Sequence, residues 1–184
     1  MKFFSTFLAA AFVALLLNVA GTMAQTSDQV ISAIQSFITS SSNLDAEVTP
    51  LNAVTFPTMG FIIAEGFNNI TSAVNTFNAE FSADTPPYPD DAAVAVVDVF
   101  TAFVEVHQDL LNVVIGKHTL AAMFGFVAPI AAALRSLEGA VVTFAFALLS
   151  LVPTESGPFT AQLDALAATF ANATMVYGGV TSVI

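Results

Sequence analysis

Side chains that could do acid–base, nucleophilic or metal chemistry are few in this chain and lie far apart. There are two histidines, His107 and His118, and no cysteine among 184 residues. No serine–histidine–acid grouping, nucleophile elbow or HExxH spacing surrounds either histidine, and two isolated histidines do not make a metal site. The acids near Asp90 and Asp98 are spaced like helix-start and surface charges, unlike a calcium-binding loop. We therefore predict no catalytic residue, no metal and no cofactor, and we expect His107 to be a solvated polar residue.

Three basic side chains are the candidates for pairing with an acidic ligand group. Lys117, His118 and Arg135 could each face a lipid carboxylate. The default explanation for them is an exposed Arg135–Glu138 pair and a helix C-terminus. After the first 24 residues, two cations stand against fourteen acids, so the charge there is near −12. Phosphate binding needs a basic footprint, so a nucleic-acid partner is excluded.

Phenylalanine is more abundant than a core of this size needs, with 18 residues in the chain. Most of these rings fall on apolar helix faces, where ordinary core packing is the default explanation. Phe126 and Phe146 fall outside the predicted stripe of their helix and indicate a second surface, either the wall of a lipid cleft or an adsorption patch. The candidate lipid-binding residues are Phe100, Phe103, Phe124, Phe126, Phe144 and Phe146.

Breakers and apolar periodicity divide the chain into about five helical segments that must position these side chains. Large apolar residues recur with alternating spacings of four and three, and polar residues repeat on the opposite side. Thr26 or Ser27 can cap the first helix, in which Ser41 is the one polar interruption of the stripe. Pro129 should kink the fourth. The predicted helices span residues 28–48, 57–82, 90–115, 120–152 and 158–177. The prediction is an all-α, single-domain bundle over residues 25–184.

The first 24 residues have the order of a secretory signal peptide. Lys2 precedes an apolar run over residues 7–17, and a small-residue site ending at Ala24 follows. Such segments are removed from the mature protein. Two sequons, which begin at Asn69 and Asn172, fit N-glycosylation on a eukaryotic secretory route. We therefore expect a secreted or cell-wall-associated glycoprotein that has no disulfide-linked partner.

A membrane-spanning segment is the strongest rival to a water-soluble bundle. Residues 118–134 carry no formal charge, and a span needs about 20 predominantly apolar residues. Arg135 and Glu138 lie one turn apart at the centre of the fourth segment, where each charge would cost about 2.5–3.5 kcal/mol in a bilayer. Small residues opposite the apolar stripe would also suit helix packing in lipid. The span is therefore the less favoured alternative.

Three stretches of the chain resemble a known family. The third predicted helix ends in "LLNVVIGKHTL", the fourth reads "VAPIAAALRSLEGAVVTFAFALLSLVP", and the last contains "ATFANATMVY". In a cysteine-free chain of five helical segments behind a signal peptide, these resemble the fungal hydrophobic surface-binding protein A family, which includes the cell-wall galactomannoproteins. The resemblance covers about Asp28 to Tyr177, with Lys117 among its marks. The chain departs from the family in its fewer lysines and serines on the polar faces and its many more phenylalanines.

The resemblance implies a secreted or wall-associated bundle that adsorbs to hydrophobic surfaces and binds fatty acids or related lipids between its helices. The leading hypothesis is accordingly a non-enzymatic amphiphilic protein that binds hydrophobic surfaces, a lipid, or both. One alternative is a structural cell-wall or extracellular component without a ligand. Another is a small esterase, for which the sequence offers no catalytic residues. Cell-wall polysaccharide and secreted hydrolases are further candidate partners.

Overall fold

The computed structural model describes residues 24–82 and 85–178, and all regular structure in these ranges is helical. The five long helices are α1 (Ser27–Val48), α3 (Phe61–Glu80), α4 (Asp90–Gly116), α6 (Val127–Leu151) and α7 (Ser156–Gly178). The short elements are α2 (Phe56–Met59), α5 (His118–Phe124) and the 3₁₀ turn η1 (Pro153–Glu155). The all-α prediction is confirmed, and the predicted signal peptide lies outside the described residues.

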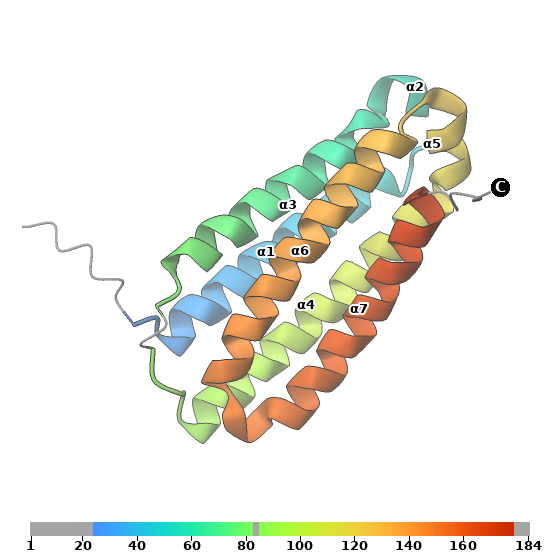
Figure 1. Ribbon diagram of the computed structural model, residues 1–184. Helices are drawn as coiled ribbons and strands as arrows, with labels where there is room; N and C mark the ends of the chain where they lie inside the picture. The colour runs from blue at the N-terminus through green and yellow to red at the C-terminus, as the bar shows by residue number, and fades with distance from the viewer. Residues whose placement is uncertain (1–23, 83–84, 179–184) are drawn as a thin grey trace, which may run out of the picture.

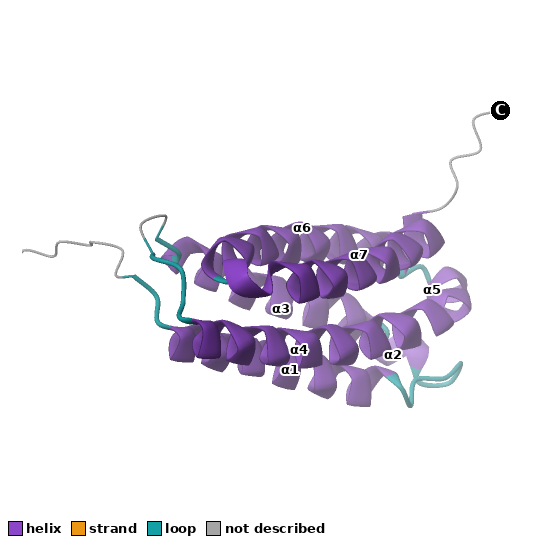
Figure 2. Cartoon of the chain, turned by 90° about the horizontal axis from the view of Figure 1, so that it is seen from below, coloured by secondary structure: helices purple, strands orange, loops and turns teal. Residues whose placement is uncertain are grey.

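The five long helices form a closed ring (Figure 1). Around it, α1 packs beside α4, α4 beside α7, α7 beside α6, α6 beside α3, and α3 beside α1. Helices α1, α4 and α7 run in one direction, and α3 and α6 run in the other. Seen from below, α6 and α7 lie on one side of the bundle, and α1 and α4 lie on the other (Figure 2). Each long helix therefore turns one face towards a shared interior.

Helix α1 shows why the sequence forms these elements. Thr26 and Gln29 make a capping box, in which the Gln29 backbone N–H donates to Thr26 Oγ1 at 3.3 Å and the Thr26 N–H donates to Gln29 Oε1 at 2.9 Å. Such boxes satisfy N–H groups that the first turn leaves free. The buried positions then repeat with the helical period: Val30, Ile34, Phe37, Ser41, Leu44 and Val48.

Helix α4 buries a wider face than its sequence stripe predicts, because it lies between α1 and α7. The predicted stripe includes Val99, Val106 and Val113, which are only half-buried. The other stripe residues Val96, Phe103 and Leu110 are buried, and a second stripe with the same spacing is buried beside them: Ala93, Val97, Phe100, Val104, His107, Leu111 and Val114. A helix with two partners needs two apolar stripes, so a single 4-3 pattern does not fix which positions are innermost.

Two helices predicted as continuous are each broken near a glycine. Gly60 separates α2 from α3, and a β-carbon there would lie 2.7 Å from Cδ1 of Phe56. Gly125 separates α5 from α6 and has φ of +81°, a conformation that favours glycine. The prediction that Pro129 kinks the fourth helix is wrong, because Pro129 lies in the first turn of α6. A backbone N–H in that turn would have no partner within the helix, so proline loses no hydrogen bond there.

Helix α6 is long and apolar enough to cross a membrane, as judged by length and composition alone. In the structure it packs between α3 and α7. Its buried residues include Leu134, Leu137 and Leu148, whereas Arg135 is exposed. This arrangement matches the core helix of a bundle.

Candidate functional site

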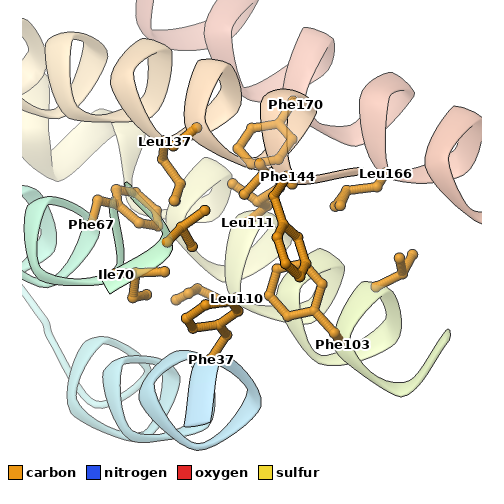
Figure 3. Close-up of a cluster of buried hydrophobic side chains, with 14 of the residues drawn as sticks. Phe37, Phe67, Ile70, Phe103, Leu110, Leu111, Leu137, Phe144, Leu166 and Phe170 are labelled. Atoms are coloured by element: carbon orange, nitrogen blue, oxygen red, sulfur yellow. The ribbon is translucent and has the colours of Figure 1, made fainter. Parts of the chain in front are cut away.

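A continuous run of aromatic rings fills the interior of the helix ring. Neighbouring phenylalanine rings have centroids 4.3–6.4 Å apart, and most of these pairs meet edge to face, as aromatic pairs in cores prefer. Phe37, Phe103 and Phe144 meet there with leucines of α4, α6 and α7 (Figure 3). We call this set the aromatic core: Phe37, Phe77, Phe81, Phe100, Phe103, Phe144 and Phe159.

The six phenylalanines predicted to bind lipid fall in three places. Three are buried in the aromatic core: Phe100, Phe103 and Phe144. Phe124 and Phe126 lie at the α2–α5 end, where each packs on the buried ring of Phe56 at centroid distances of 6.2 and 5.8 Å. Phe146 faces outward from α6 and is 62% exposed. The structure thus brings half of the predicted set into one site.

A polar pair is buried beside the aromatic core. Ser41 on α1 and His107 on α4 are both fully inaccessible, and Ser41 Oγ lies 3.0 Å from His107 Nδ1. Phe103 stacks on the imidazole with centroids 5.2 Å apart, and Phe170 of α7 lies 5.4 Å away on a tilted plane. The expectation that His107 is solvated is therefore wrong, because the second stripe of α4 carries it inward.

The second ring nitrogen of His107 has no partner. Nε2 is buried, and no described protein group forms a hydrogen bond with it. If the Ser41 hydroxyl donates to Nδ1, then Nε2 carries the proton and lacks an acceptor; in the other tautomer, Nε2 is an acceptor that lacks a donor. Burial lowers the pKa of His107 from 6.5 to about 4, because a charged imidazole loses its hydration there. The ring is therefore neutral near pH 7.

An unpaired polar nitrogen in an apolar core needs an explanation, because leaving it unsatisfied costs about 1–3 kcal/mol relative to a paired group. An apolar residue of similar size would avoid that cost. The arrangement can serve a ligand that brings one oxygen to Nε2 and an apolar chain to the surrounding rings. Neutral Nε2 can accept a hydrogen bond from a protonated carboxyl or an alcohol, or donate one to a carboxylate, according to its tautomer.

Each member of this pair has a separate signal in the sequence, but their pairing has none. Ser41 interrupts the apolar stripe of α1, and a hydroxyl on a buried face needs a partner from another element. His107 lies on the second 4-3 stripe of α4. Only the three-dimensional packing of α1 against α4 brings the two side chains together.

The three basic residues named as possible carboxylate partners lie away from the aromatic core. Lys117 Nζ donates to the backbone oxygens of Thr49 and Leu51, both at 2.8 Å, and so links the end of α4 to the end of α1. The His118 ring meets Tyr177 edge to face at 5.1 Å. Arg135 is exposed on α6. The structure brings none of them to His107.

The remaining predicted sites lie on the outer surface of the described helices. Asn69 on α3 and Asn172 on α7 are both exposed, and N-glycosylation at each stays a prediction. Asn69 borders a shallow hollow of about 210 Å³ between α1 and α3. Within residues 24–82 and 85–178, no group of three or more histidine, aspartate or glutamate side chains could hold a metal ion.

The fold and the core together define the class of this protein: a helical bundle of five long helices around an aromatic interior that contains one polar pair. No protein-family model and no curated protein matches the chain. Two solved structures share the fold. One is Afmp4p in complex with palmitic acid, with a TM-score of 0.75, 12% identity, and coverage of 83% of this chain and 99% of that one.

The other structure is ligand-binding domain 1 of the Penicillium marneffei MP1 protein, complexed with arachidonic acids. Its TM-score is 0.63 at 15% identity, again with coverage of 83% of this chain and 99% of that one. At such low identity the likeness shows the fold alone. The resemblance to the hydrophobic surface-binding protein A family therefore stays a prediction.

Proposed function

We propose that this protein is a secreted, non-enzymatic binder of a fatty-acid-like lipid, which it holds between its helices, and that it also adsorbs to hydrophobic surfaces. One observation carries the lipid part: the unpartnered, buried Nε2 of His107 within an aromatic interior. That combination matches a ligand with one polar end and a long apolar chain.

The aromatic core and His107 have separate tasks in this proposal. Each methylene that the core removes from water contributes about 0.8 kcal/mol, so the acyl chain supplies most of the affinity. His107 Nε2 binds the polar head, and Ser41 fixes the ring through Nδ1. Because the core rings are packed closely in this structure, the helices must separate for the chain to enter. The palmitic acid of Afmp4p and the arachidonic acids of the MP1 domain support a ligand of this class.

Displacement of a fluorescent fatty acid tests the lipid part directly. Purified residues 25–184, stripped of lipid, should bind the probe and release it when palmitate is added. Hexadecane should compete at least tenfold less well, because it offers no oxygen to His107. Release of the probe by neither compound would contradict lipid binding and leave a structural role. Hydrolysis of a p-nitrophenyl ester by the purified chain would contradict the non-enzymatic part.

Replacement of the two histidines tests the site. His107→Leu should weaken palmitate binding about tenfold or more, because the head loses its hydrogen bond. His118→Leu is the matched control and should bind within twofold of the original chain. Titration calorimetry measures both affinities. Equal affinities for the two variants would place the head elsewhere in the bundle.

Secretion rests on the signal-peptide pattern of residues 1–24. We expect the chain recovered from culture medium to begin at Gln25, as N-terminal mass spectrometry would show. A product that stays in the membrane fraction and keeps its first 24 residues would contradict secretion.

A further inference from the structure

One end of the bundle exposes large apolar side chains from three separate segments. Helices α2 and α5 pack together there, beside the start of α3 (Figure 1). Val54 is 85% exposed, Met59 44%, Phe61 49% and Met123 64%. We call these four residues the apolar tip. Exposed apolar side chains gathered at one end of a molecule mark an interaction site more often than scattered single residues do.

The two sequence segments that form the apolar tip contain no formally charged residue. Residues 48–64 and 118–134 contain no Asp, Glu, Lys or Arg. The opposite end of the bundle, where α1 and α4 begin and α3 ends, is acidic. Its exposed acids are Asp28, Glu80, Asp90 and Asp91. The molecule is therefore amphiphilic along its length. One end is apolar, with the Lys117 ammonium bound there to the backbone oxygens of Thr49 and Leu51, and the other end is anionic.

We propose that the apolar tip docks this protein on an electrically neutral lipid surface. This inference deepens the surface-binding part of the proposed function and rests on it. The occupant follows from charge. A cationic partner would be drawn to the acidic end, and an anionic lipid surface would repel a chain whose charge is near −12 after residue 24. A neutral lipid layer is neither drawn to the acidic end nor repelled by the negative charge of the chain.

The shape of the tip also fits a fluid surface. Its four exposed side chains come from the loop before α2, from α2, from the first residue of α3 and from α5, so they can enter a lipid layer together without a matching groove. Glu47 and Glu65 are exposed and border the uncharged segments. Because these carboxylates must stay hydrated, docking stops at the first turn of α3. The long helices stay in water.

A tryptophan placed in the tip reports docking without background, since the chain has no tryptophan of its own. Met123→Trp should show a blue-shifted emission when phosphatidylcholine vesicles are added to the mature chain. Val94→Trp, an exposed position near the start of α4 at the opposite end, is the control and should not shift. A shift at both positions, or at neither, would overturn docking by the tip.

Charge substitutions measure the contribution of the tip to binding. Phe61→Glu and Met123→Glu should each lower partition into phosphatidylcholine vesicles at least tenfold in a sedimentation assay. Val94→Glu adds the same charge at an exposed apolar side chain of the opposite end and should stay within twofold. Admixture of phosphatidylserine should weaken binding of the original chain. Equal losses in the three variants, or stronger binding with phosphatidylserine, would overturn the proposal.

The same assays separate this inference from the function on which it rests. If the original chain binds neither vesicles nor polystyrene beads, the surface-binding part of the proposed function fails, and the docking inference fails with it. If the original chain and both tip variants bind vesicles equally, only the docking inference fails. Circular dichroism at 222 nm confirms that each variant is folded before it is compared.

Discussion

At the scale of single residues, His107 combines two properties that a purely structural side chain would not need. Its Nδ1 is fixed by Ser41 at 3.0 Å, and its Nε2 is buried without a protein partner. A packed core gains nothing from such a nitrogen, because an apolar ring of similar size fills the space at no polar cost. A binding site gains orientation from it, since a head group that pairs with Nε2 fixes where an acyl chain begins.

The buried histidine predicts how stability depends on pH. The folded-state pKa of His107 is about 4 and lies below its ordinary value of 6.5. Between pH 4 and pH 6.5, the imidazole is therefore protonated in the unfolded chain and neutral in the folded chain. Stability from this group is complete above pH 6.5, falls as the pH drops through that window, and reaches its lower plateau below about pH 4. The loss is about 3 kcal/mol across the window.

Urea unfolding at pH 7.0, 5.5 and 4.5, followed by circular dichroism, measures this effect as a difference between two chains. The stability of His107→Leu should change less with pH than that of the original chain, because its leucine does not titrate. The difference between them isolates His107 from the carboxylates that both chains share. Parallel curves for the two chains would show that His107 titrates normally and is exposed to solvent.

At the scale of helices, the periodic pattern predicted the type and approximate bounds of all five long elements. It did so because alternating 4-3 spacings and breakers are local properties of the sequence. It missed the breaks at Gly60 and Gly125, which depend on the approach of Phe56 in one case and on a positive φ in the other. The pattern also predicted only one buried stripe on α4, whereas the contacts of α4 with both α1 and α7 bury two stripes.

The candidate site was only partly predictable for the same reason. Phe100, Phe103 and Phe144 lie in the core as apolar periodicity suggests. The Ser41–His107 pair joins positions 66 residues apart, and nothing local indicates that these two polar residues meet. Lys117, His118 and Arg135 were candidate carboxylate partners because they are basic. In the structure they lie at helix termini or on an exposed face, away from the aromatic core.

Lys117 gives a prediction about how helix ends are joined. Lys117→Met removes two hydrogen bonds from Nζ to the end of α1 and should lower the free energy of unfolding by about 1.5–3 kcal/mol, as for bonds to a charged donor. Arg135→Met, on an exposed position, should change it by less than about 0.5 kcal/mol. Thermal unfolding measures both.

Neither variant should change palmitate affinity by more than twofold, since both side chains lie away from His107. A loss of affinity in Lys117→Met at unchanged stability would restore the lysine as the carboxylate partner.

At the scale of the whole molecule, the aromatic core contributes to stability and, under the proposed function, also blocks the path of a ligand. Phe144 has ring centroids within 6.1 Å of three other phenylalanines, on α1, on α3 and just after α3. Rings packed in this way leave room for an acyl chain only when helices move apart. Under the proposed function, ligand entry therefore requires the helix ring to open transiently, and association is expected to be slower than the usual 10⁵–10⁷ M⁻¹s⁻¹.

A pair of core truncations checks this coupling. Phe144→Ala and Phe159→Ala should each cost about 3–5 kcal/mol of stability, as typical for buried phenylalanine. Only Phe144→Ala should speed palmitate association in stopped-flow measurements, because it loosens the contact between α6 and α1. Phe159 stacks on Phe100 at the start of α7 and serves as the matched control. Equal rates for the two variants would argue for entry by another route.

The chain enters the bundle at Ser27 and leaves it at Gly178, and these two points lie at opposite ends of the molecule (Figure 1). A fusion partner added behind α7 would therefore emerge on the same side as α2 and α5, whereas one added ahead of α1 would emerge beside the carboxylates. In tests of the proposed docking, an affinity handle or fluorescent reporter consequently belongs ahead of α1, because a bulky appendage behind α7 would shield Met123 and its neighbours and mimic a loss of lipid adhesion.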